Sequence, residues 1–188
     1  RPPPPKVTDG TWARTDVDRF VLTRLESEGL SPVADADPQV LVRRVFFDLT
    51  GLPPSPEQVD HFVADPSPAA LSRLIDQLLD SPQFGERWGR HWLDVVRYGE
   101  STGMERNFTY PYAWRYRDYV IKSFNEDKPF DRFITEQVAG DLLAADGADQ
   151  RQEQLVATGL LALGPKSLNE PNRDKFVMDV VDEQIDVT

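Results

Sequence analysis

The segment from Phe84 to Tyr98 carries the densest set of side chains that could do chemistry. At 100° per residue, one face of a helix in this segment would present Glu86, Arg90, Asp94 and Arg97. Alternating charges at this spacing are typical of a solvated stripe of ion pairs. Alternatively, the stripe faces a cleft, where charges removed from water would be costly and specific. His91 borders this face, either as a proton shuttle oriented by Asp94 or as a hydrogen-bonded packing residue.

The irregular segment from Gly99 to Pro111 brings further charged groups close to that helix. Loops on a rigid scaffold carry a large share of binding chemistry, and a connection of about a dozen residues is long for one without a role. We therefore place any binding site around this loop, without assigning a catalytic residue. The predicted members are His91, Asp94, Arg97, Glu100, Glu105, Arg115 and Asp118. The alternative is a surface loop held by ordinary ion pairs.

Several patterns that carry cofactors or catalysis are missing from the sequence. It has no cysteine, which excludes disulfides, thiolate metal sites, iron–sulfur clusters and covalent haem attachment within these residues. The two histidines, His61 and His91, lack His-Glu-x-x-His spacing. There is no glycine-rich phosphate loop and no Gly-x-Ser-x-Gly elbow. We therefore expect no cofactor and no metal site in this chain.

Capping residues followed by proline divide the chain into short amphipathic helices. The pattern recurs at Ser55-Pro56, Ser67-Pro68 and Ser81-Pro82, and no stretch alternates as a strand does. It predicts an all-α, compact, irregular bundle of seven to nine helices. The longer expected helices span 16–28, 82–98, 112–124, 130–143, 152–163 and 173–185. Within 82–98 the predicted core face carries Phe84, Trp88, Trp92 and Val95.

The first residues differ in character from the rest. Four consecutive prolines, Pro2–Pro5, indicate an extended arm, either an interdomain linker or a ligand for a proline-binding module. We expect a proline-rich linker over residues 1–14 and a single helical domain over 15–188. Because the chain begins at Arg1 without Met or a signal peptide, we expect it to be a fragment of a longer protein.

The charge balance bears on partners. The 188 residues carry a net charge of -11, from 32 acidic and 21 basic side chains. This disfavours nucleic acid and anionic lipid as partners, although a local basic patch remains compatible with it. No apolar run approaches the roughly 20 residues of a membrane span, so we expect no membrane insertion. Aromatic residues with arginine near Tyr112–Tyr119 could bind carbohydrate by stacking, or could simply pack in the bundle.

Longer strings of the sequence resemble a known family. They include Phe47–Pro56, Ser81–Trp88, Arg90–Asp94, Tyr112–Val120, Asn125–Asp131, Glu136–Leu143 and Asp179–Asp186. Together they are similar to a domain of unknown function found in large planctomycete proteins that carry cytochrome c-like modules. The resemblance covers the chain from about Asp16 to its end.

The resemblance implies an exported protein, at the periplasm or cell surface, whose downstream part could hold haem. It supplies no catalytic residues. It implies a non-catalytic helical module that scaffolds the larger protein or docks its cytochrome c-like segment, with other domains of the same polypeptide as partners. The alternative is an enzyme or binding domain acting on carbohydrate.

The cofactor expectation has a direct test. Because the chain lacks thiolates and has two isolated histidines, the purified protein mixed with haem should show no Soret band after gel filtration. Elemental analysis after dialysis should likewise find no stoichiometric transition metal. A persistent Soret band or a retained metal would contradict the expectation.

Overall fold

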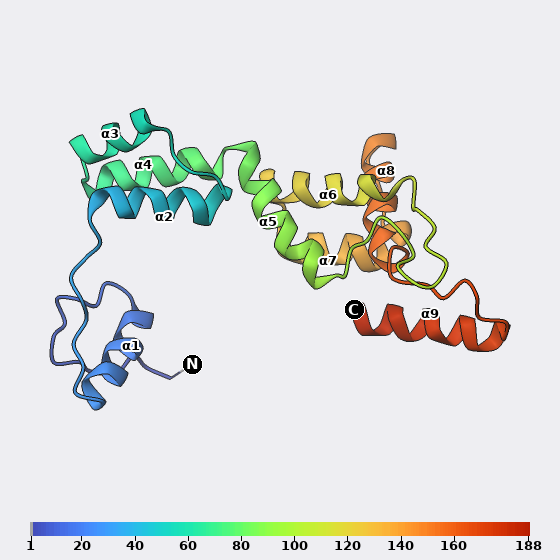
Figure 1. Ribbon diagram of the computed structural model, residues 1–188, viewed down its shortest axis with the longest axis horizontal. Helices are drawn as coiled ribbons and strands as arrows, with labels where there is room; N and C mark the ends of the chain where they lie inside the picture. Colours follow the sequence, from blue (N-terminus) through green and yellow to red (C-terminus); the bar gives the residue numbers. More distant parts are fainter. Residues whose placement is uncertain (1) are drawn as a thin grey trace.

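The computed structural model describes residues 2–188, and its regular structure is helical (Figure 1). Two 3-10 turns, Gly140–Leu142 and Thr158–Leu161, interrupt nine α-helices in this range, and the only strand-like feature there is an antiparallel bridge between Ser101 and Thr109. The predicted all-α bundle is confirmed. The helices are α1 (Asp16–Ser27), α2 (Pro38–Thr50), α3 (Pro56–Ala64), α4 (Pro68–Leu79), α5 (Pro82–Val95), α6 (Ala113–Asn125), α7 (Phe130–Ala139), α8 (Ala148–Ala157) and α9 (Arg173–Val187). None of these helices is long and apolar enough to cross a bilayer.

The cap–proline pattern sets where the early helices begin. The Asp37 carboxylate accepts a hydrogen bond from the Gln39 amide, and the Ser55 hydroxyl accepts one from Gln58. Each cap satisfies a backbone donor that the first turn leaves without a partner. At α5 the pattern works differently, because the Ser81 hydroxyl donates backwards to the Leu78 carbonyl (2.7 Å). It thereby ties the end of α4 to the start of α5.

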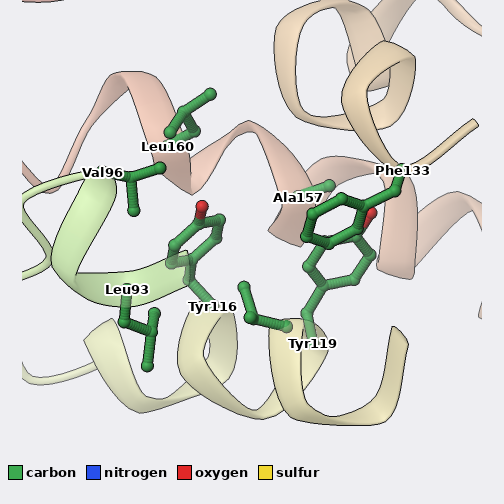
Figure 2. Close-up of a cluster of buried hydrophobic side chains, with 8 residues drawn as sticks. Leu93, Val96, Tyr116, Tyr119, Phe133, Ala157 and Leu160 are labelled. Atoms are coloured by element: carbon green, nitrogen blue, oxygen red, sulfur yellow. The ribbon is translucent and has the colours of Figure 1, made fainter. Parts of the chain in front are cut away.

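Buried apolar side chains form two clusters. One lies among α2, α3 and α4 and contains Val42, Phe46, Phe62 and Leu78. The other is built by α5, α6, α7, α8 and the Thr158–Leu161 turn, where Tyr116 and Tyr119 of α6 lie between Leu93, Phe133 and Leu160 (Figure 2). Helix α5 runs between the two groups and packs against both α2 and α6 (Figure 1).

The segments before and after α1 wrap around it, away from the other helices (Figure 1). The Thr8 amide donates to the Glu26 carboxylate (2.9 Å), and Arg14 pairs with Asp35 (3.3 Å). Leu22 is the buried residue of this helix. The division into a linker over 1–14 and one domain over 15–188 stays a prediction.

The buried face of α5 differs from the predicted one. Its buried residues are Gly85, Gly89 and Leu93, continued by Val96 after the helix, whereas Val95 is 72% exposed. Phe84, Trp88 and Trp92 are half-buried. The prediction that these four residues form the core was wrong for Val95 and too strong for the aromatic residues. Periodicity counts large apolar side chains, whereas this helix turns its two glycines towards α6.

The two glycines allow α5 and α6 to approach closely. A Cβ at Gly85 would lie 2.5 Å from the Ile121 carbonyl oxygen and 2.5 Å from the Asn125 side chain. At Gly89 it would lie 3.2 Å from the Ile121 side chain. The Gly85 amide lies near the start of α5, where backbone donors need partners outside the helix, and it donates to the Asn125 side-chain oxygen (2.8 Å). The Asn125 side chain in turn donates to the Pro82 carbonyl (3.3 Å), so this one side chain joins the start of α5 to the end of α6.

Three helices end at least three residues earlier than predicted. Helix α8 spans Ala148–Ala157 rather than 152–163, and the 3-10 turn Thr158–Leu161 follows it. Helix α5 stops at Val95 rather than Tyr98, because Arg97 adopts a left-handed conformation (φ 54°) and the Tyr98 amide returns to the Leu93 carbonyl (2.9 Å). Helix α7 stops at Ala139 rather than Leu143, where Gly140 lies directly against the backbone of Gln154 in α8.

Substitution of Gly85 should therefore destabilise the fold. In Gly85→Ala the added methyl group meets backbone as well as a side chain, so α5 and α6 must separate, and we expect a loss of about 2 kcal/mol or more in unfolding free energy. Gly147→Ala is the matched control, because a Cβ there meets nothing within 4 Å and the backbone is extended. Urea denaturation of both variants measures the difference; equal losses would contradict this packing.

Candidate functional site

An aromatic hollow of about 490 Å³ lies where α5, α6 and α7 meet. Four phenylalanines line it: Phe84 of α5, Phe124 of α6, and Phe130 and Phe133 of α7. The turn between α6 and α7 supplies Asp127, Lys128 and Pro129. We call this feature the aromatic hollow. Its volume and its mainly apolar lining are typical of a ligand site.

Phe133 is the buried centre of this aromatic group. Its ring lies edge-on to Trp92 (4.9 Å between centroids) and to Phe124 (5.9 Å), and it stacks on Tyr119 (6.0 Å; Figure 2). Phe130, by contrast, is 68% exposed. The hollow therefore has a rigid base and one large apolar side chain that still faces water.

A buried ion-pair cluster, consisting of Glu136, Lys128, Arg132 and Tyr119, lies beside the hollow. Glu136 is 1% exposed. Its carboxylate accepts hydrogen bonds from Lys128 (2.6 Å), Arg132 (2.8 Å) and the Tyr119 hydroxyl (2.9 Å). The Lys128 ammonium also lies 4.6 Å from the centre of the Tyr119 ring. One carboxylate thus joins α6, α7 and the turn between them.

The hydrogen bonds of the cluster shift the pKa values of Glu136 and Tyr119 in opposite directions. Burial by itself raises the pKa of Glu136, but the hydrogen bonds from Lys128, Arg132 and Tyr119 outweigh it and leave the pKa below its ordinary value. Burial, followed by the hydrogen bond to Glu136, raises the pKa of Tyr119. Near neutral pH the carboxylate is therefore ionised and the phenol protonated. Neither group has the pKa near 7 that suits general acid–base catalysis.

Gln137 forms a second buried polar connection. Its side-chain oxygen accepts hydrogen bonds from the Tyr116 hydroxyl (2.6 Å) and the Trp92 indole (2.9 Å). Its amide nitrogen donates to the Phe133 carbonyl (3.0 Å). These bonds satisfy the polar tips of two core aromatic residues, as buried polar groups require.

The sequence analysis did not select Lys128, Glu136 or Gln137 as site residues. A signal was available, because Glu136 and Gln137 follow Phe133 at the i+3 and i+4 positions and so lie on the same helical face as a core aromatic residue. Polar residues on a core face must find partners inside the protein.

The structure separates the residues at the end of α5 that were predicted to form a site. His91 is exposed and lies edge-on to the Trp88 ring (5.4 Å), while Asp94 pairs with Arg90 (2.9 Å) on the solvated face. Among the described residues no hydrogen bond or ion pair joins His91 to Asp94. Arg97 turns away to α9, where it pairs with Glu183 (3.2 Å) and Asp186 (3.3 Å).

The remaining predicted members fall into three further groups. Arg117 bridges Glu100 (3.2 Å) and Asp118 (3.0 Å). The Arg115 guanidinium lies over the rings of Tyr112 (5.1 Å) and Trp114 (5.5 Å). Glu105 accepts a hydrogen bond from Asn169 (3.3 Å). The seven residues are thus engaged in separate contacts, and a binding role for them stays a prediction.

The loop from Gly99 to Pro111 is anchored to the segment before α9. The Lys166 amide donates to the carbonyl of Thr102, which is buried, and the Tyr110 hydroxyl donates to the Gly164 carbonyl (2.9 Å). Across residues 2–188, His, Asp and Glu side chains form no group of three or more that could hold a metal ion.

Comparison with known proteins identifies one family. The family model PSCyt2, described as a protein of unknown function (DUF1549), matches residues 16–188. No curated protein and no solved structure matches the chain.

The ion-pair cluster predicts a pH-dependent stability. Glu136→Gln leaves Lys128 and Arg132 without their carboxylate, and we expect a loss of about 3 kcal/mol in unfolding free energy at pH 7. Because the pKa of Glu136 is lowered on folding, its contribution is complete above the unfolded pKa of about 4.3 and is lost as the pH falls through the folded value. The difference between wild type and variant should therefore shrink in acid.

Urea denaturation between pH 7 and pH 3 measures this difference. Glu86→Gln is the control, because Glu86 is an exposed residue of the neighbouring helix with no ion pair among residues 2–188. A Glu136→Gln variant as stable as this control at pH 7 would show that the cluster contributes nothing.

Proposed function

The chain belongs to the PSCyt2 family, whose function is unknown, and we propose that it is a non-catalytic docking module of a larger exported protein. In this proposal the aromatic hollow receives another segment of the same polypeptide, and the partner is its cytochrome c-like segment. Haem then belongs to that downstream part. Location at the periplasm or cell surface is part of the proposal and rests on the family resemblance.

The observation that carries the proposal is the exposed aromatic rim of the hollow. Phe130 is 68% exposed beside Phe84 and Phe124, and Phe133, the fourth phenylalanine of the lining, is fixed by Trp92 and Tyr119. Burying apolar surface stabilises a complex by about 25 cal/mol per Å², and aromatic side chains in preformed pockets dominate the binding energy of interfaces. A partner side chain entering the hollow would remove this surface from water.

The outer face of α9 supports a scaffolding role. This helix has no buried residue, and its exposed apolar side chains are Val177, Met178, Val181 and Ile185. Their spacing places them on one side of the helix, whereas Val180, Glu183 and Val187, which line the contact with Leu160 and Leu161, lie on a different side. A contiguous apolar face of this kind is typical of a surface that packs against another domain.

The non-catalytic part of the proposal rests on how the charged groups are engaged. Glu136 is saturated by three donors, and the Arg97, Glu100 and Asp94 side chains are each engaged in a different ion pair. The lining of the aromatic hollow has one carboxylate, Asp127, while its Ser123 hydroxyl donates to the Tyr119 carbonyl (2.8 Å) and its Lys128 ammonium pairs with Glu136. The lining instead suits the burial of an apolar group.

One observation favours the alternative of a domain acting on carbohydrate. Asp127 is exposed in the wall of the hollow with no ion pair to residues 2–188, and Lys128 lies next to it. Aromatic rings that stack on a sugar, together with polar groups that bond its hydroxyls, are the parts that carbohydrate recognition requires.

The docking proposal predicts the effect of changing Phe130. Binding of the remainder of the polypeptide, produced separately with any cytochrome c-like segment loaded with haem, is measured by isothermal titration calorimetry. Phe130→Ser should weaken this binding about tenfold or more while leaving the melting temperature nearly unchanged, because the side chain is exposed in the free chain.

Phe108→Ser is the matched control, since Phe108 is also an exposed phenylalanine but lies in the loop between α5 and α6. Failure of the wild-type chain to bind, or equal weakening by both variants, would overturn the docking proposal. Hydrolysis of a polysaccharide, or saturable binding of one that Asp127→Asn abolishes, would favour the carbohydrate alternative.

A further inference from the structure

Three arginines line an open hollow on the side of α5 that faces α2, away from its contact with α6. The hollow, of about 830 Å³, lies between α2 and the first turns of α5 and is lined by Arg43 and Arg44 of α2 and by Arg87 of α5. Asp48 is the only acidic residue of its lining. The site thus carries a net positive charge in a protein whose overall charge is -11.

None of these three arginines forms an ion pair with a carboxylate within residues 2–188. Seven other arginines in that range form ion pairs with carboxylates, whereas Arg19, Arg106, Arg115, Arg151 and Arg173 do not; the arginine hollow differs from these in bringing three such arginines together. In addition, the Arg87 Nε is buried and has no hydrogen-bond partner. Buried donors nearly always have partners, so this nitrogen is unusual among the described residues.

Packing holds two of the guanidinium groups in place. Gly51 ends α2 in a left-handed conformation (φ 71°), and a Cβ there would lie 3.1 Å from Cδ of Arg87, so the glycine leaves room for the arginine stem. The Arg43 guanidinium lies over the Phe47 ring, 4.8 Å from its centre. Pre-organised side chains lose less conformational entropy when a ligand binds.

We propose that this arginine hollow binds a multivalent oxyanion, a phosphate or a polycarboxylate. A guanidinium presents its donors in a planar fork that matches carboxylate and phosphate oxygens. All three arginines line the hollow, Arg87 from α5 and Arg43 and Arg44 from the facing helix. This site is distinct from the aromatic hollow and does not depend on the docking proposal.

The test uses inorganic phosphate and citrate as separate probes of the whole chain. Each is titrated while the Nε–Hε resonances of the arginines are followed by NMR at low ionic strength, where electrostatic binding is strongest. We expect a saturable shift of the Arg87 resonance with at least one probe. A response to phosphate alone or to citrate alone identifies which oxyanion the hollow takes.

Two variants and one control complete the experiment. Arg87→Lys keeps the charge but removes the planar fork, and Arg44→Gln removes an exposed charge from the rim; each should weaken binding about tenfold or more. Arg19→Gln removes an equal charge from the exposed surface of α1 and should leave the affinity unchanged. If Arg87→Lys does not fold, the affinity of Arg44→Gln for the two oxyanions tests the proposal by itself. The absence of a saturable shift with both probes, or equal weakening by Arg19→Gln, would overturn the proposal.

Discussion

The close approach of α5 and α6 is the constraint on which the rest of the structure depends. It exists because Gly85 and Gly89 present no side chain to Ile121 and because Asn125 bonds the first turn of α5. With the axes this close, Leu93 and Val96 reach the tyrosines of α6, and Trp92 reaches Gln137 on α7. Phe84 is carried to the edge of the same interface, where it meets Phe124 and completes the aromatic hollow.

Polar groups inside the larger cluster fix its geometry more than they add to its stability. A buried ion pair loses much of its Coulomb energy to desolvation, but it tolerates few alternative arrangements. Glu136 accepts its three hydrogen bonds only when α6, α7 and their connecting turn lie where they do. Lys128, in the wall of the hollow, is therefore held from behind by Glu136. The wall of the aromatic hollow is therefore held by packing and hydrogen bonds, although its outermost ring, Phe130, is exposed.

Helix α5 also connects two surfaces of different chemistry. Phe84 faces the apolar hollow at α6 and α7, whereas Arg87, less than one turn later, faces the basic hollow at α2. The aromatic hollow combines α5 with α6 and α7, and the basic hollow combines α5 with α2, so both include side chains of this helix.

The sequence by itself determined the helices and the fold class. Caps such as Ser55-Pro56 and stops such as Gly51 act on their own turn of backbone, and local interactions of this kind are visible in a single sequence. The tertiary structure alone decided which face of α5 is buried, because glycine adds nothing to a hydrophobic pattern while permitting the closest contact. It also separated the residues of the predicted charged site, since Arg97 pairs with residues nearly ninety positions later on α9. Glu136, which was not predicted, accepts hydrogen bonds from Tyr119 of α6 and Lys128 of the following turn. Charges choose partners by distance in space, and that distance is set only when the helices have packed.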